Sequence, residues 1–375
     1  MNFLKIISFV LIGLVVFLVA SSYLANDSFQ DVKSDTSDKI DSTIEDVKDN
    51  NLFSKPKDAY DSIKNKITFG SFDRNISTEV FFCPEEDCLT ELLELISSSK
   101  KTIDCAVYDV SLETVTDALI EKSNQGLEIR FISDYGTSQN KSSNLGLLKD
   151  SNVTVLTNSS ESSYMHNKFC VFDEKIVFVG SMNFTLNGNY KNNNNVLIIE
   201  DKEIAKEYTN KIDSFFKGEF SPKPKEVYNV NNYGNLENYF CPEDDCLYHL
   251  LRFANDANYS IECMLFSYTL DDFFQEVVDK NIDQRYILES RGISQYSKYN
   301  DLKNNSIPVI LDQNPNSMHN KFCIIDDYIV LTGSMNYSNN GTKNNDESFL
   351  VIHDFEIAQE YKDYFNDYWT SWSNN

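Results

Sequence analysis

Two short stretches of the sequence place a histidine and a lysine in matching surroundings. The stretch YMHNKFC contains His166 and Lys168, and the stretch SMHNKFC contains His319 and Lys321. Residues i and i+2 of a strand point to the same face, so each histidine is expected to project beside its lysine. The chain has only four histidines, and two of them lie in this pattern.

The same polar residues follow each pair at the same distances, in the pattern H-x-K-x4-D-x6-G-S-x-N. The first set is Asp173, Gly180, Ser181 and Asn183, and the second is Asp326, Gly333, Ser334 and Asn336. A Gly-Ser turn at the end of a strand lets the backbone and a hydroxyl approach a bound oxyanion. The asparagine amide adds a neutral donor.

Two copies of this set suit one phosphate that is attacked on one side and protonated on the other. Lysine, serine and asparagine donors match the charge that grows on the non-bridging oxygens. One unprotonated histidine attacks phosphorus, and the other donates a proton to the departing alcohol and later activates water. Imidazole suits both tasks because its pKa lies near neutrality. No residue cluster has metal-ligand spacing, so neither a metal nor another cofactor is expected, and the lysines would take the place of a metal.

Both motif copies resemble the signature of the phospholipase D superfamily, and the duplicated organisation covers residues 79–372. The resemblance implies a metal-independent phosphodiester hydrolase or transferase with a phosphohistidine intermediate at the interface of two lobes. His166 and His319 are then the nucleophile and the general acid/base, and the motif aspartates are structural. The residues that would hold the phosphate are Lys168, Lys321, Asn183 and Asn336, with Ser181 and Ser334 in support.

Members of this family often carry an acid beyond the asparagine that orients a histidine of the other lobe. Glu347 stands 28 residues after His319, whereas Asn194 stands 28 residues after His166. If the partnership crosses the interface, Glu347 orients His166 and raises its basicity. The hypothesis is therefore that His166 is the nucleophile and that Glu347 belongs to the catalytic set.

A unit of roughly 150 residues occurs twice in the 375-residue chain. Residues 165–184 and 318–337 are identical at 13 of 20 positions, and FFCPEEDC at 81–88 matches YFCPEDDC at 239–246. The predicted fold is α/β, with two duplicated mixed-sheet lobes related by a pseudo-twofold axis and the active site at their interface. Because one chain holds both half-sites, a monomer is expected.

Hydrophobic periodicity gives the elements of the lobes. Helices are expected at 88–98, 112–124, 201–216 and 354–372. Strands are expected in the first lobe at 102–107, 127–133, 153–156, 168–172, 176–179 and 196–199. The domain boundaries that follow are 71–216 for the first lobe, 217–232 for the linker and 233–375 for the second lobe.

The amino-terminal sequence predicts a membrane anchor or a signal peptide within residues 1–25. Residues 6–25 carry no charge and are long enough to cross a bilayer as a helix, and Lys5 precedes them. Either reading exports the body, so the expected location is membrane-anchored or secreted, with the catalytic part outside the cytoplasm. Residues 26–70 form a polar, acidic tether.

Each of the four cysteines in the first half has a counterpart at the corresponding position of the second half. In an exported protein, the C-P-E-E-D-C spacing predicts local disulfides Cys83–Cys88 and Cys241–Cys246, with a metal site as the alternative. The other four cysteines lie in apolar strands and are expected to be small buried hydrophobic residues rather than nucleophiles. These four are Cys105, Cys170, Cys263 and Cys323.

The motifs specify a phosphodiester but not what is attached to it. The first hypothesis is phospholipase D-type hydrolysis of phospholipid headgroups, because the anchor would set the body beside lipid and the net charge of -25 repels polyanions. The alternatives are an exported endonuclease, the only reading with a nucleic-acid partner, and cardiolipin synthase-like transphosphatidylation. A catalytically inactive binding module on the cell surface is the alternative from a different class.

Overall fold

The computed structural model describes residues 74–159, 163–224 and 232–373. The chain separates into the units Met1–Arg74 and Asn75–Asn375. The predicted anchor and tether lie outside the described residues, as do residues 225–231 of the predicted linker. Within the described ranges, no helix combines the length and the apolar character needed to span a membrane.

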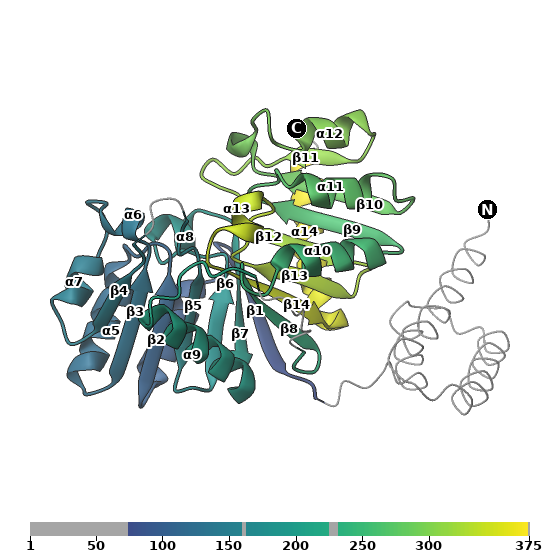
Figure 1. The fold of residues 1–375 in the computed structure, drawn as a ribbon. Coiled ribbons are helices and arrows are strands. Elements are labelled where there is room, and N and C mark those ends of the chain that lie inside the picture. Colours follow the sequence, from purple (N-terminus) through teal and green to yellow (C-terminus); the bar gives the residue numbers. More distant parts are fainter. Residues whose placement is uncertain (1–73, 160–162, 225–231, 374–375) are drawn as a thin grey trace, which may run out of the picture. The chain divides into compact units, whose positions relative to one another are not determined.

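Two mixed sheets of seven strands each form the body of the second unit (Figure 1). Their orders are β1-β7-β6-β5-β2-β3-β4 and β8-β14-β13-β12-β9-β10-β11, so the second repeats the first strand by strand. The first sheet contains β1 (Ser77–Cys83), β2 (Thr102–Val107), β3 (Glu128–Ser133), β4 (Thr154–Thr157), β5 (Lys168–Phe172), β6 (Ile176–Gly180) and β7 (Asn194–Glu200). The second contains β8 (Leu236–Cys241), β9 (Ser260–Leu265), β10 (Asp283–Leu288), β11 (Val309–Leu311), β12 (Lys321–Ile325), β13 (Ile329–Gly333) and β14 (Glu347–His353).

In each sheet three strands are parallel and the others are antiparallel. Strands β2, β3 and β4 run parallel, while β5 pairs antiparallel with both β2 and β6. The second sheet repeats this with β9, β10, β11 and β12. This is the α/β architecture with duplicated mixed-sheet lobes that the sequence predicts.

The helices lie on both faces of each sheet. The first lobe has α4 (Cys88–Ser98), α5 (Glu113–Asn124), α6 (Tyr135–Ser138), α7 (Leu145–Lys149), α8 (Leu186–Tyr190) and α9 (Lys202–Phe216). The second has α10 (Cys246–Asp256), α11 (Asp271–Val278), the 3₁₀ turn η1 (Ser290–Gly292), α12 (Tyr299–Asn304), α13 (Asn339–Lys343) and α14 (Phe355–Ser373). Helix α9 begins after Asp201, whose carboxylate accepts hydrogen bonds from the backbone of Glu203 and Ile204.

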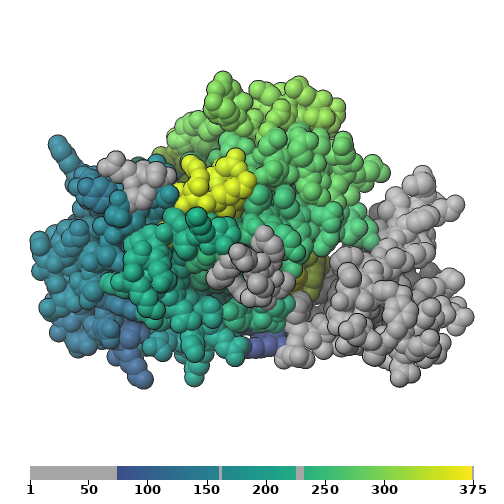
Figure 2. All heavy atoms as spheres, in the orientation of Figure 1, coloured from purple at the N-terminus to yellow at the C-terminus, as the bar shows by residue number. Residues whose placement is uncertain are grey.

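Three hydrophobic clusters hold these layers together. The apolar faces of α4 and α5 pack on the outer face of the first sheet, and those of α10 and α11 pack on the second. The third cluster is shared by the lobes and contains the apolar faces of α9 and α14 together with the inner faces of both sheets. Figure 2 shows the second lobe, in green and yellow, directly against the blue and teal first lobe.

The strand that follows each histidine is buried on both faces. All five residues of β5 are buried, with Phe169 and Val171 in the shared core and Cys170 and Phe172 in the outer core. A strand that is covered on both faces is expected to have a continuous run of apolar residues, and β5 has one in FCVF after its first residue. The first residue of this rigid strand is Lys168.

All eight cysteines form disulfides. The predicted pairs Cys83–Cys88 and Cys241–Cys246 are confirmed. The other four cysteines are buried, as predicted, but they are not single hydrophobic residues, because they form the pairs Cys105–Cys170 and Cys263–Cys323. In each pair the two cysteines lie directly opposite one another on neighbouring antiparallel strands.

Candidate active site

The backbone around each histidine is held by the other lobe. The N–H of His166 donates to the carbonyl of Asp346 over 2.9 Å, and the N–H of Asp346 donates to the carbonyl of Tyr164 over 2.9 Å. In the other half-site, the N–H of His319 donates to the carbonyl of Asn193 over 2.8 Å, and the N–H of Asn193 donates to the carbonyl of Ser317 over 2.9 Å. Each half-site is therefore assembled from both lobes, as a pseudo-twofold arrangement would produce.

A carboxylate that follows β3 or β10 fixes the residue before each histidine. Asp134, just after β3, accepts a hydrogen bond from the N–H of Met165 at 3.1 Å. Glu289, just after β10, accepts one from the N–H of Met318 at 2.6 Å. Neither acid was predicted from the sequence. Asp134 directly follows a predicted strand, and Glu289 directly follows the equivalent strand of the second lobe.

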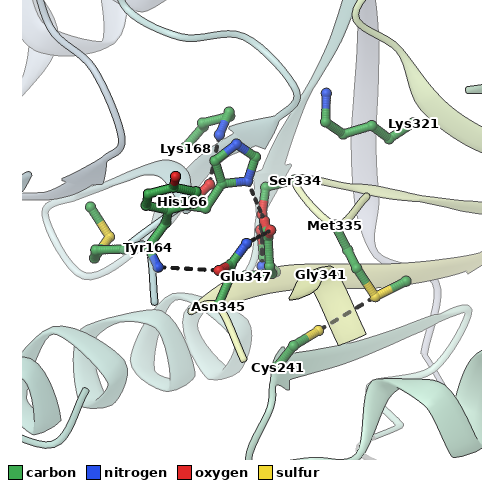
Figure 3. A network of polar contacts seen from close by, with 12 residues as sticks. Tyr164, His166, Lys168, Cys241, Lys321, Ser334, Met335, Gly341, Asn345 and Glu347 are labelled. Atoms are coloured by element: carbon green, nitrogen blue, oxygen red, sulfur yellow. Dashed lines mark hydrogen bonds and ion pairs between the residues drawn. The ribbon is translucent and has the colours of Figure 1, made fainter. Parts of the chain in front are cut away.

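The two imidazoles have different partners, and each partner comes from the opposite lobe. Nδ1 of His166 lies 2.7 Å from Oε2 of Glu347, the contact that the sequence predicts (Figure 3). Nδ1 of His319 lies 2.9 Å from Oδ1 of Asn194. The Asn194 amide nitrogen donates to the carbonyl of Gly188 over 2.8 Å, which directs its oxygen toward the histidine. Because an amide oxygen only accepts, His319 carries its proton on Nδ1 and leaves Nε2 available for chemistry. His166 has the same tautomer when Glu347 is ionised.

The two motif serines bind the partners of the histidines. The hydroxyl of Ser334 donates to Oε2 of Glu347 at 2.6 Å, and that of Ser181 donates to Oδ1 of Asn194 at 2.9 Å. Each hydroxyl also accepts a backbone N–H, and both serines are fully buried. In the structure these hydroxyls orient the acceptors on which the histidines depend. Support of the phosphate by the two serines stays a prediction.

The two lysines are buried beside the histidines. Nζ of Lys168 donates to the carbonyl of His166 at 2.6 Å, and Nζ of Lys321 donates to that of His319 at 2.7 Å. Each ammonium also lies over an aromatic ring, Tyr108 at 5.1 Å for Lys168 and Phe266 at 4.9 Å for Lys321. The same two rings make edge contacts with the histidines. In Figure 3, Lys321 lies across from the His166 imidazole.

Burial and mutual repulsion govern the charges of these groups. Burial lowers the pKa of Lys168 to about 7, although Glu347 and two aspartates counteract it. Burial and the charge of Lys168 lower the pKa of Lys321 well below its usual range. Burial and both lysines lower the pKa of each histidine, and His166 also lowers that of His319. The two histidines and two lysines therefore act on one another, as groups that surround a common site do.

Glu347 is the buried acid among these cations. Burial raises its pKa to about 8, while Lys168, Ser334, Asn345 and Lys321 pull it down. Its carboxylate accepts from Ser334, from the Asn345 amide at 3.3 Å and from His166. In the empty site burial therefore favours the protonated acid, and the positive charge that His166 gains when it reacts favours the ionised form, which these donors stabilise.

The motif aspartates have the structural role that the resemblance implies. The carboxylate of Asp173 accepts backbone hydrogen bonds from Lys100, Lys101 and Thr102, where β2 begins. Asp326 accepts the equivalent bonds from residues 258–260 before β9. Neither aspartate contacts the histidines, so they stay outside the candidate catalytic set.

The motif asparagines follow the serines at the ends of β6 and β13. Asn183 and Asn336 are half-buried, and the Oδ1 atom of each is buried without a hydrogen-bond partner among the described residues. A Cβ on Gly188 would lie 2.1 Å from the carbonyl oxygen of Asn183, and one on Gly341 would lie 2.2 Å from that of Asn336. The motif therefore extends to a glycine five residues after the asparagine, a repeat that the sequence analysis missed.

Within the described ranges, no three side chains of His, Cys, Asp or Glu are gathered so that they could hold a metal ion. The residues that converge are two histidines, two lysines and one glutamate. This set offers nucleophilic, acid-base and cationic groups.

Comparison with known proteins identifies the family. The family model described as "Cardiolipin synthase, PLD-like domain" matches residues 92–216 and 248–369, one match in each lobe. The chain belongs to the phospholipase D-like family. The matched segments contain both histidine–lysine motifs, both partner residues and both serines, so the family assignment and the geometry concern the same atoms.

Curated relatives align with part of the chain. A mitochondrial cardiolipin hydrolase of Xenopus tropicalis is 29% identical over 37% of this chain and 67% of its own length. A phospholipase D of Rickettsia prowazekii is 31% identical over 36% of this chain and 64% of its own length. The chain thus spans about two thirds of these phospholipase D-like relatives.

A solved structure shares the arrangement of both lobes. Phosphatidylserine synthase of Haemophilus influenzae Rd KW20 matches with a TM-score of 0.60 and 13% identity, over 79% of this chain and 88% of its own. At this identity the likeness concerns the fold alone.

Proposed function

We propose that the protein hydrolyses phosphodiesters through a phosphohistidine intermediate on His166. The observation that carries the proposal is the unequal pairing of the two histidines, His166 with Glu347 and His319 with Asn194. A carboxylate partner raises the basicity of its imidazole, whereas a neutral amide fixes the same tautomer without adding charge. His166 is therefore the better nucleophile and His319 the better acid.

In the first step, Nε2 of His166 attacks phosphorus and forms a P–N bond. The charge of the bound phosphate offsets that of the lysines and raises the pKa of His319, so that this histidine binds a proton. The bond between phosphorus and the leaving oxygen breaks on the opposite side, and protonated His319 donates its Nε2 proton to that oxygen. The alcohol departs, and His319 becomes neutral. The negative charge of Glu347 balances the positive charge that develops on His166.

In the second step, neutral His319 removes a proton from water, and the water oxygen attacks phosphorus. The P–N bond breaks, His166 returns to its neutral form and His319 is again protonated. The products are a phosphomonoester and the free alcohol.

The lysines and asparagines would stabilise the phosphate throughout. Bound phosphate oxygens offset the repulsion between Lys168 and Lys321, which raises the pKa of both ammonium groups. Rotation of the Asn183 or Asn336 side-chain amide would place a nitrogen donor where a buried oxygen now lacks a partner. Four donors that are already in place would then face the charge that grows in the transition state.

We propose membrane phospholipid as the substrate, with hydrolysis at the headgroup. The relatives from Xenopus tropicalis and Rickettsia prowazekii are named for lipid hydrolysis, and the net charge of -25 opposes a polyanion such as DNA. Asp109, Asp134 and Glu347 all act electrostatically on Lys168, which adds local negative charge. An anchored or secreted monomer with its body outside the cytoplasm fits this proposal.

Transfer to a second alcohol is the other candidate reaction. The description of the matching family model, a cardiolipin synthase, favours it. The chemistry differs only in the second step, where a lipid hydroxyl replaces water. An endonuclease activity has no comparable support.

The test is to incubate the full chain in EDTA with three substrates: phosphatidylcholine vesicles, cardiolipin vesicles and plasmid DNA. Phosphatidic acid release supports lipid hydrolysis, a new lipid–lipid product supports transfer, and nicking supports the endonuclease. Bis-p-nitrophenyl phosphate reports phosphodiesterase chemistry whatever the substrate. The proposal is rejected if the wild-type protein, like His166→Asn, converts none of the four.

A further inference from the structure

A buried cluster of charged groups crosses the lobe boundary beside the candidate site. Lys211 of α9, in the first lobe, has an almost fully buried side chain. Its Nζ lies 2.7 Å from Glu243 and 3.3 Å from Asp346, both in the second lobe. The N–H of Ser221 donates to both carboxylate oxygens of Asp346, at 2.9 and 3.0 Å. Asp346 is therefore held by α9 and by the segment that leaves it.

Asp346 also joins this cluster to His166. Its carbonyl accepts the N–H of His166 at 2.9 Å, and the next residue, Glu347, contacts the His166 ring at 2.7 Å. One short stretch of the second lobe thus binds the backbone and the imidazole of the same histidine. Any movement of Asp346 would change both contacts.

The second half-site holds the equivalent backbone without a lysine–carboxylate ion pair. Asn193 occupies the equivalent position, and its carbonyl accepts the N–H of His319 at 2.8 Å. Its side-chain amide donates to the hydroxyls of Tyr364 at 3.2 Å and Tyr368 at 2.8 Å, and to the Glu85 carboxylate at 3.4 Å. Tyr364 lies on α14 at the position that corresponds to Lys211 on α9. The ionic cluster therefore exists only on the side of His166 and Glu347.

Packing alone does not require this charge. Burying a lysine with two carboxylates costs desolvation energy, and hydrophobic or neutral replacements are often at least as stable. The tyrosine–asparagine arrangement in the same chain shows that this fold also accepts neutral residues in place of the lysine and the aspartate. A buried ion pair does add a strong constraint on position, because any displacement leaves a charge unpaired.

We propose that Lys211 and Asp346 form a positioning pair, which fixes the segment leading into β14 so that the Glu347 carboxylate meets Nδ1 of His166. Neither residue contacts the reacting atoms, so they act through Glu347. The inference rests on the proposed function, because it concerns the same reaction.

The experiment uses the full chain and bis-p-nitrophenyl phosphate, in a double-mutant cycle of Asp346→Asn and Glu347→Gln. Asp346→Asn keeps the shape of the side chain and leaves Lys211 paired with Glu243, so the protein is expected to fold. The kcat of the single variant should fall about 10- to 100-fold, because small misplacements of catalytic groups are costly. Its KM should change less than about threefold, since the phosphate-binding lysines remain. In the Glu347→Gln background, Asp346→Asn should cost less than about threefold, because the two residues act in one chain of contacts.

Arg130→Met is the matched control. Arg130 of β3 pairs with Asp104 and with Asp213, each at 2.6 Å, and all three residues belong to the first lobe. Asp213 lies on the same helix as Lys211. The kcat of Arg130→Met should stay within about twofold of the wild type. Lys211→Met is a second probe, expected to match Asp346→Asn in kcat if it folds; if it does not, the cycle decides alone.

Three results separate the possibilities. Folded Asp346→Asn with wild-type kcat and only a lower melting temperature overturns the inference, since the pair is then merely structural. Equal costs of Asp346→Asn with and without Glu347 also overturn it. A wild-type protein that leaves the probe intact rejects the proposed function and this inference with it, whereas an active wild type with an unaffected Asp346→Asn rejects this inference alone.

Discussion

His166 and Glu347 belong to different lobes, and Nδ1 of the histidine lies 2.7 Å from Oε2 of the glutamate. The opposite histidine has an amide oxygen in the same place. The two half-sites therefore share their geometry, and the partner of the imidazole is an acid in one and a neutral amide in the other. The predictions for catalysis follow from this difference.

Removing the partner of each histidine should have unequal effects. Glu347→Ala should lower kcat by about 10²- to 10⁴-fold, because His166 loses both its orientation and its counter-charge. Asn194→Ala should cost about 10-fold, because His319 loses only orientation. Steady-state kinetics with bis-p-nitrophenyl phosphate measures both, and equal losses would contradict the assignment of His166 as the nucleophile.

Replacing the acid histidine should trap the intermediate. In His319→Asn, His166 can still attack phosphorus, but no base activates water, so phosphoprotein should accumulate. Acid-labile label on the peptide that contains His166 identifies it by mass spectrometry. His166→Asn is the matched variant and should take up no label; label on His319 in that variant would exchange the two roles.

The pH dependence should reflect the low pKa of Lys168, which burial lowers to about 7. Below this pH the lysine is charged and attracts the phosphate; above it the free protein loses that charge. The value of kcat/KM should therefore fall as the pH rises above about 7. The fall in kcat should begin at higher pH, because bound phosphate favours the ammonium form. Lys168→Met should have a lower kcat/KM and lack this alkaline fall; a variant that keeps it would assign the fall to another group.

Glu237 should stabilise the second lobe at neutral pH. Burial raises the pKa of this glutamate, but His353, Arg252 and Tyr239 outweigh burial and lower it to about 2. Because the folded pKa lies below the usual 4.5, the stabilisation is complete above about pH 4.5 and is lost as the pH falls through 2. Glu237→Gln should lower the free energy of unfolding by roughly 3 kcal/mol at pH 7, measured by urea unfolding.

The matched control is Glu79→Gln, at the equivalent position of β1. Glu79 is exposed, so its replacement should change the free energy of unfolding by less than about 0.5 kcal/mol. If the two variants were equally stable at pH 7, the contacts of Glu237 would contribute nothing net.

The cysteine pairing can be checked chemically. Alkylation of the denatured, unreduced protein should label none of the eight cysteines. Peptide mapping should recover the cross-strand pairs Cys105–Cys170 and Cys263–Cys323. Free thiols at these four positions would instead support their description as small buried hydrophobic residues.

Local sequence patterns predict those elements that carry their own signal. The helix α4 and the strands β2 and β5 have the predicted bounds, because their apolar periodicity is uninterrupted. The edge strand β1 was not predicted, since its pairing partner β7 lies more than a hundred residues later in the chain. Strand pairing of this kind depends on topology, which no local window contains.

The same reason separates the predicted from the unpredicted site residues. The histidines, lysines and Glu347 recur at fixed spacings, so duplication reveals them. Lys211 is an ordinary lysine on a polar helix, and only the packing of α9 against the other lobe brings it to Asp346. The disulfide Cys105–Cys170 was missed because two strands distant in sequence lie side by side.

Both lobes belong to one polypeptide, so a substitution in one lobe does not change the other. An assembly of two identical subunits would have to place the same residue beside both imidazoles. Here Glu347 and Asn194 occupy corresponding places with different chemistry. A duplicated chain of this kind lets each half specialise, and the Glu347 carboxylate is one place where the two halves have diverged.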